Sequence, residues 1–171
     1  MQITTKMLTR SAIILALAIA VQSVRLPQYV TGPVINALLF FAAAIIGPVS
    51  AVLIGLLTPV IAFAFGIMPL APAVPVIILG NAVLAIVFGL LIKKPYVAVV
   101  VAALAKYGIM FISVTYLLPL LLNITLPPKL IATLTTPQLF TALGGGVLAL
   151  AVIKGTDILT KEKPQMNDTS K

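Results

Sequence analysis

Long apolar segments separated by short breaks constrain this chain more than any other feature of its sequence. A helix needs about 20 apolar residues to cross the roughly 30 Å hydrocarbon core of a bilayer. Proline and glycine, which end helices, mark nearly all of the breaks. The segments are Met7–Val24, Gly32–Ile46, Val49–Phe65, Pro75–Ile92, Tyr96–Leu122 and Leu130–Ile153. This pattern predicts an all-α membrane protein with six transmembrane helices.

The composition supports a lipid environment. Hydrophobic residues make up 61% of the 171 residues and charged residues only 8%, whereas soluble domains carry about 25% charged residues. A soluble protein of this length has too little interior to bury so much apolar surface. We therefore expect the lipid bilayer to surround most of the chain.

The short second segment leaves an alternative, because segments two and three could form one long kinked helix. The positive-inside rule, by which basic residues collect on the cytoplasmic side, separates the two cases. With six spans, most basic residues fall on one side, whereas Arg25 and Lys129 fall on the other. The residues on the first side are Lys6, Arg10, Lys93, Lys94, Lys154, Lys161, Lys163 and Lys171. Five spans would divide this group, so we predict six spans with both termini in the cytoplasm. We also expect the protein in a prokaryotic plasma membrane.

The chain reads as one transmembrane domain over residues 1–157, followed by a polar cytoplasmic tail over residues 158–171. All three acidic residues, Asp157, Glu162 and Asp168, lie at the C-terminal end, and we expect the tail to be solvated and mostly disordered. The basic residues are scattered between apolar segments, which argues against a nucleic-acid-binding face.

Missing residue types exclude several functions. The chain has no Cys, no His and no acidic residue in any predicted span. The usual soft-metal ligands and ordinary general bases are therefore absent, so we expect no metal, no cofactor and no enzymatic activity. Ion-coupled transporters usually carry a carboxylate within the membrane, although backbone and hydroxyl oxygens could bind sodium without one. A transporter of this composition is expected to take its energy from a partner.

Lys106 is the most informative polar residue within the spans. It lies ten residues beyond Tyr96, about 15 Å into the membrane at 1.5 Å per residue. That depth favours a cation that holds an anionic or carbonyl-bearing ligand. The alternative is a lysine that contacts neighbouring carbonyl groups or extends to the outer interface.

The other candidate residues lie at the midplane or in the outward half of the predicted spans, which indicates a cavity open to the outside. Interhelical hydrogen bonds are the alternative role for Asn81 and Gln138, and a place in the interfacial aromatic belt is the alternative for Tyr107. Met110 shares the helix face of Lys106. The predicted substrate-binding residues are Lys106, Asn81, Gln138, Asn36, Gln22, Tyr107 and Met110.

The first span carries small residues four positions apart, at Ala12, Ala16 and Ala20. Such spacing lets another helix approach closely. The partner helix could belong to this protein or to another subunit, and the residues alone leave both possibilities open.

Together these features resemble the S components of energy-coupling-factor (ECF) transporters, through about Asp157. The alanine row resembles the small-residue motif of their first helix. The stretch Thr31-Gly32-Pro33-Val34-Ile35-Asn36-Ala37-Leu38, followed by Gly47-Pro48, resembles a family signature. The resemblance implies capture of a vitamin or similar small water-soluble micronutrient at the outer face. It also implies a transmembrane coupling subunit that docks on the alanine row, and two ATPase subunits that drive release inward.

The resemblance leaves the substrate open. The chain has no Trp, unlike members that clamp an aromatic vitamin with tryptophan, and no N-terminal His, unlike the nickel and cobalt members. Small hydroxylated or carboxylated ligands remain. The alternative functions are a self-contained small permease or channel, and a non-transport membrane assembly subunit.

Overall fold

The computed structural model describes residues 4–68, 71–123 and 128–161, and within these residues it contains helices and no strand. The helices are α1 (Thr5–Ser23), α2 (Gln28–Ile45), α3 (Pro48–Ala64), α4 (Ala73–Leu90), α5 (Pro95–Ile112), the π-helix η1 (Ser113–Leu117), α6 (Leu118–Leu122) and α7 (Pro128–Lys161). Five of the helical segments are long and apolar enough to cross a membrane, and α3 is a shorter apolar helix. The predicted all-α fold with six apolar spans is confirmed.

Separate α2 and α3 remove the alternative of one long kinked helix. Gly47 lies between them with a φ of 126°, a backbone conformation that glycine adopts far more easily than other residues. Pro48 then starts α3 at a position where a missing N–H costs nothing. The dipeptide at residues 47–48 therefore ends one helix and begins the next.

The start of α2 differs from the expectation. The helix begins at Gln28, four residues before the expected start at Gly32, and continues through Pro33. Proline is tolerated inside membrane helices because neighbouring helices can satisfy the freed backbone groups. Asn36 is consequently eight residues inside α2, about 12 Å from its start, rather than in its outer turn.

The fifth predicted span is one continuous rod of three labelled helices, in which α5 passes through η1 into α6. The π-helical turn was not predicted. At the other end of the chain, α7 extends to Lys161, so residues 158–161 of the predicted tail are helical. Residues 162–171 lie outside the described residues.

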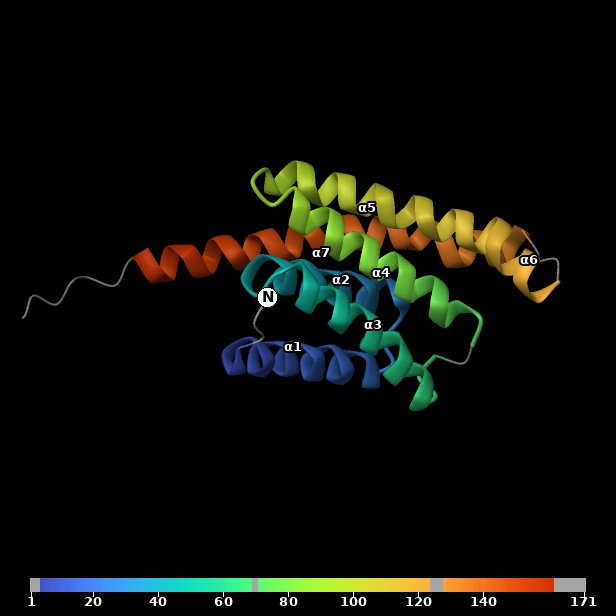
Figure 1. Ribbon diagram of the computed structural model, residues 1–171, viewed down its shortest axis with the longest axis horizontal. Coiled ribbons are helices and arrows are strands. Elements are labelled where there is room, and N and C mark those ends of the chain that lie inside the picture. The colour runs from blue at the N-terminus through green and yellow to red at the C-terminus, as the bar shows by residue number, and fades with distance from the viewer. Residues whose placement is uncertain (1–3, 69–70, 124–127, 162–171) are drawn as a thin grey trace, which may run out of the picture.

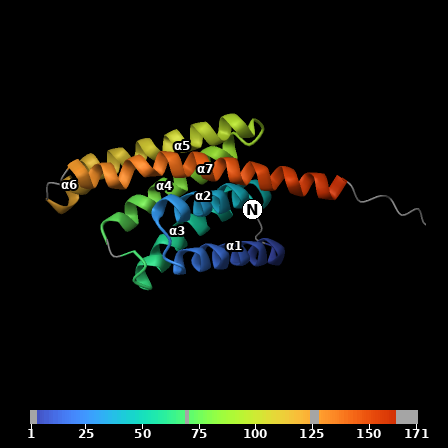
Figure 2. The same cartoon turned by 180° about the vertical axis from the view of Figure 1, so that it is seen from behind.

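The helices form a bundle with two distinct ends (Figures 1 and 2). The start of α1, the α4–α5 turn and the end of α7 lie together at what we call the basic end, which carries Lys6, Arg10, Lys93, Lys94 and Lys154. The ammonium of Lys154 lies 5.1 Å from the centre of the Tyr96 ring there. The α1–α2 turn and the α3–α4 connection lie at the opposite end, which we call the pocket end.

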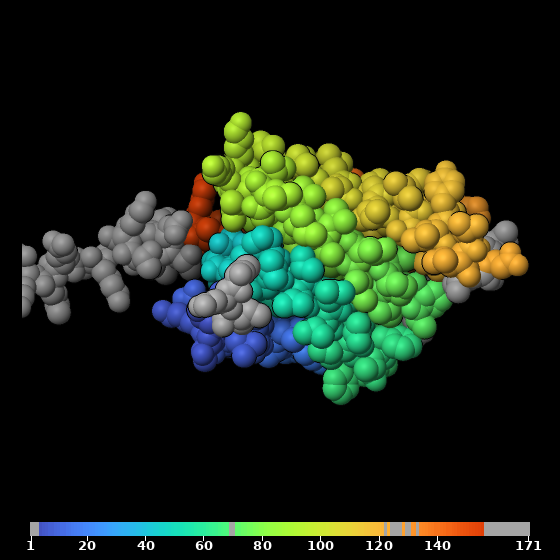
Figure 3. Space-filling view, in the orientation of Figure 1, coloured from blue at the N-terminus to red at the C-terminus, as the bar shows by residue number. Residues whose placement is uncertain are grey.

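The two ends are packed differently. The main apolar core includes Phe40, Leu84 and Ala102 and fills the half of the bundle nearer the basic end. In it, the rings of Phe40 and Phe88 meet edge to face with centroids 4.9 Å apart. At the pocket end, α5, α6 and the start of α7 project beyond α1 and α3, as the space-filling view shows (Figure 3). The two ends therefore differ in outline as well as in packing.

Candidate substrate-binding site

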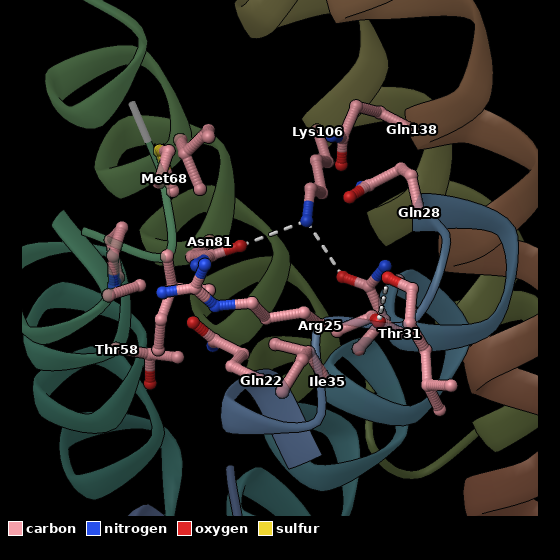
Figure 4. A pocket seen from close by; sticks show the side chains of 17 residues that line it. Gln22, Arg25, Gln28, Thr31, Ile35, Thr58, Met68, Asn81, Lys106 and Gln138 are labelled. Atoms are coloured by element: carbon pink, nitrogen blue, oxygen red, sulfur yellow. Dashed lines mark hydrogen bonds between the residues drawn. The ribbon is translucent and has the colours of Figure 1, made fainter. Parts of the chain in front are cut away.

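A buried lysine joins three helices at mid-height in the bundle. Lys106 on α5 is only 2% exposed. Its ammonium donates hydrogen bonds to Asn36 Oδ1 on α2, at 2.7 Å, and to Asn81 Oδ1 on α4, at 2.9 Å (Figure 4). Both asparagines are also 2% exposed. The ammonium is therefore solvated by two neutral amide oxygens in place of water.

The orientation of both amides follows from their other hydrogen bonds. Asn36 Nδ2 donates to Thr141 Oγ1 at 3.3 Å, and the Thr141 hydroxyl donates to the backbone oxygen of Gln138 at 3.2 Å. Asn81 Nδ2 donates to the backbone oxygen of Gly55 at 3.1 Å. Each amide thus uses its donor on an acceptor of another helix and presents its oxygen to the lysine. The network connects α2, α3, α4, α5 and α7.

Glycines allow the helices to approach closely enough for these bonds. A Cβ added at Gly145 on α7 would lie 2.6 Å from Asn36 Cβ, and one at Gly55 would lie 2.9 Å from Asn81 Cβ. A Cβ at Gly80 would lie 2.8 Å from the sulfur of Met110. Real Cβ atoms do not occupy such positions. Close helix packing at these glycines therefore positions the two asparagines against Lys106.

The lysine lies at one wall of a cavity of about 300 Å³ at the pocket end. Five amide side chains line it, together with two threonines, two cations and mostly aliphatic residues. The lining residues are Gln22, Arg25, Leu26, Gln28, Thr31, Gly32, Ile35, Asn36, Thr58, Pro59, Ala62, Ile67, Met68, Ile77, Asn81, Lys106 and Gln138. The cavity is thus lined by both polar and aliphatic side chains.

Five of the seven predicted substrate-binding residues line this cavity: Gln22, Asn36, Asn81, Lys106 and Gln138. The structure does not bring the other two into it. Tyr107 is the next residue on α5 and lies on a different face of the helix from Lys106. Its ring stacks with that of Phe111, and the ring centroids are 6.2 Å apart. Met110 is buried in a second apolar cluster with Val76 and Val114, because it packs on the glycine face of α4.

Several lining residues were not predicted, above all Arg25. Its charge was used only to assign sides of the membrane. Gln28 and Thr31 follow it in the break between the first two spans. The sequence did offer one signal for these residues, which is a polar break at the outward end of two spans. It does not show which side chains of that break turn into the bundle.

The side chains that line the cavity are suited to binding a small molecule. Two cationic side chains, Lys106 and Arg25, line the cavity and no acidic side chain does. Within the described part of the chain, no three His, Cys, Asp or Glu side chains come together as a metal site. A cavity lined by aliphatic side chains and several polar groups can hold and orient a small molecule.

The alanine row lies on a different surface. Only Ile14 and Ala18 of α1 are buried, whereas Ala12, Ala16 and Ala20 are exposed on the side away from the bundle. Packing within the described protein therefore does not use this row. Whether another subunit covers it stays a prediction.

Comparisons with known proteins agree with this architecture. The family model for the substrate-specific component of ECF transporters matches residues 6–156. No curated protein and no solved structure matches the chain. The matched range contains all of the described transmembrane helices except the ends of α1 and α7, together with every residue of the cavity. The chain therefore belongs to the family of substrate-specific components of ECF transporters, and is a multi-pass membrane protein that captures a substrate.

Proposed function

We propose that the chain captures a small water-soluble vitamin or similar micronutrient at the outer face of a prokaryotic plasma membrane, and that partner subunits drive its uptake. The observation that carries the proposal is the buried ammonium of Lys106 at the wall of an open cavity. Burying a charge is costly. A packed apolar residue would serve stability better, so a lysine at this position points to a ligand.

The lysine has donor capacity left for that ligand. An ammonium has three N–H donors, and the asparagine oxygens accept two of them. The third is available to an acceptor in the cavity. A hydrogen bond to a charged group contributes about 1.5–3 kcal/mol, and the low dielectric around the buried ammonium strengthens it.

The two ends of the bundle support an orientation in the membrane. Basic residues gather at the end opposite the cavity, and basic residues favour the cytoplasmic side. This distribution supports cytoplasmic termini and a cavity mouth at the outer face. A cysteine introduced at Gln28 should react with membrane-impermeant reagents in intact cells, and one at Met1 should not. Labelling at Met1 from outside would reverse the orientation.

The partners are a transmembrane coupling subunit and two ATPase subunits. The chain itself offers no phosphate-binding loop, so ATP hydrolysis is assigned to those partners. The exposed alanine row on α1 supports a docking surface for the coupling subunit, since small residues let helices pack closely.

Native mass spectrometry of the purified protein tests the capture function. We expect a small solute to co-purify with the natural chain and to be lost from Lys106→Met. Lys154→Met removes a lysine at the basic end and should retain the solute. Equal retention by both variants, or uptake by the chain alone in liposomes, would contradict the proposal.

A further inference from the structure

Arg25 occupies a turn whose backbone conformation is unfavourable for arginine. It follows the C-terminus of α1 with a φ of 55°, and its N–H bonds to the oxygen of Gln22 at 3.0 Å. This left-handed position after a helix is usually filled by glycine or asparagine, because a Cβ is strained there. The turn therefore does not explain why the residue is an arginine.

Asn123 provides the internal comparison. Within the described residues it is the other non-glycine with a positive φ, at 53°, and it ends α6 in the same conformation. Asparagine is one of the residue types that tolerate this region. Asn123 does not line the cavity, whereas Arg25 extends its side chain into it (Figure 4).

The guanidinium of Arg25 adds a second positive charge to a cavity without a negative one. Arg25 and Lys106 both line it, and the chain's acidic residues all lie at or beyond Asp157. The described residues give the guanidinium no ion pair or hydrogen bond. Lys106 is buried and Arg25 is exposed. Charges that line a cleft act on a solute inside it, so the two together favour an anion over a cation.

The rest of the cavity limits the size and character of that anion. A volume of about 300 Å³ corresponds to about ten water molecules in the liquid, and thus to roughly 10–15 non-hydrogen atoms. Among the described residues, the lining contains aliphatic side chains such as Ile35, Ile67 and Ile77 and no aromatic side chain. No stacking surface for an aromatic ring is offered.

We infer that Arg25 is a specificity-determining residue, and that the site takes a small aliphatic carboxylate held by the charges of Arg25 and Lys106. The inference rests on the proposed function of the cavity. Its amide and hydroxyl groups, among them Gln28, Gln138 and Thr31, are available for hydroxyl or amide groups on the same ligand. The turn holds an arginine, where glycine or asparagine is usual, because the ligand requires its charge.

The absence of cysteine from the chain permits a direct measurement of the charge in the cavity. Ile35→Cys places one thiol on its lining. The probes are an anionic sulfonatoethyl and a cationic trimethylammonioethyl methanethiosulfonate, and the result is the ratio of their reaction rates relative to a free thiol. We expect the anionic probe to be favoured, and Arg25→Gln to lower the ratio by about tenfold.

Two variants in the same background control this measurement. Arg25→Lys keeps the charge and should keep most of the preference, while Arg10→Gln at the basic end should leave the ratio unchanged. Equal rates for the two probes, an effect of Arg10→Gln as large as that of Arg25→Gln, or a thiol that reacts with neither probe would overturn the inference.

Thermal unfolding distinguishes a role of Arg25 in ligand specificity from a role in the stability of the fold. Arg25→Gly relieves the strained φ, so its unfolding midpoint should be equal to or above that of the natural chain while the anion preference falls. Asn123→Gly makes the same backbone change outside the cavity and should leave the preference intact. A lower midpoint for Arg25→Gly would show that Arg25 serves the fold and would contradict the inference.

The identity of the co-purified solute distinguishes failure of this inference from failure of the proposed function. A captured neutral, cationic or aromatic solute would contradict the inference that the ligand is an aliphatic carboxylate, but it would not contradict the capture function. A protein that captures no solute, yet prefers the anionic probe, would contradict the capture function and leave the role of Arg25 in the cavity's charge standing.

Discussion

The two halves of this bundle are built from the same helices but packed for different purposes. Toward the basic end, α2, α4 and α5 contribute Phe40, Phe88 and Ala102 to an apolar core. At mid-height the same three helices contribute Asn36, Asn81 and Lys106, and the cavity lies beyond them. The first half is filled by apolar side chains, whereas the second contains a cavity beside the buried ammonium of Lys106.

The difference teaches where stability and function reside. The apolar half gains from close packing of side chains, which drives helix association in membranes. The polar half carries the cost of a buried ammonium, offset by two amide oxygens. Substitutions in the first half should therefore change the free energy of unfolding, and those in the second should change ligand binding. Four predictions, in order of decreasing effect, test this division.

The largest effect is expected in the packed half. Phe88→Ala removes a buried ring that meets Phe40 edge to face and leaves a cavity, so it should lower the free energy of unfolding by about 3–5 kcal/mol. Thermal or denaturant unfolding in detergent measures this loss. Solute retention in the fraction that stays folded should be normal. A folded variant that has lost the solute would break the division between the halves.

Lys106→Met should produce the reverse outcome. The loss of a charge-assisted hydrogen bond of about 1.5–3 kcal/mol should weaken ligand binding by roughly tenfold to a hundredfold. The unfolding midpoint should fall less than in Phe88→Ala, because removal of a costly buried charge partly offsets the two asparagine oxygens that lose their donor.

Two further measurements sharpen the test of Lys106. The weakened binding should persist at high salt, since a buried contact is poorly screened. Lys106→Arg should not restore full affinity, because the planar guanidinium needs more room than the ammonium. An unchanged affinity with monodisperse protein would make Lys106 structural.

Gly145→Ala should affect both halves. The new Cβ would lie 2.6 Å from Asn36 Cβ and from the backbone oxygen of Pro33, so α2 and α7 must separate, at about 1–3 kcal/mol of stability. The shift of Asn36 should weaken ligand binding as well. Gly144→Ala is the matched control, because its added Cβ would lie 3.8 Å from Pro33 Cβ, an ordinary van der Waals distance. Equal behaviour of the two variants would show that close approach at Gly145 does not position Asn36.

The smallest effect on the isolated chain is expected for Ala16→Leu. The side chain is exposed on α1, so stability and solute binding should stay within about 0.5 kcal/mol of the natural chain. Co-purification with the coupling subunit should be lost, because the added bulk separates the helices. Normal complex formation would remove the alanine row from the docking surface.

Much of the fold was predictable from the chain itself. The length and apolar character of each span, with proline and glycine at the breaks, indicated the helices. Whether a segment can cross a membrane depends on its own residues, which is why this level of structure can be read locally. Depth is equally local, since it follows from the rise per residue, and it indicated that Asn81 and Lys106 lie deep in the bundle.

Only the tertiary structure decided which polar side chains meet. Residues 106 and 107 are adjacent in sequence, yet Lys106 lines the cavity and Tyr107 stacks near Phe111 outside it. The turn after α1 carries Arg25 into the same cavity. Rotation of a helix about its axis is set by how closely its neighbours pack, here at Gly55 and Gly145. Such contacts join residues far apart in the chain, so the local pattern indicates the depth of a side chain but not the neighbour it meets.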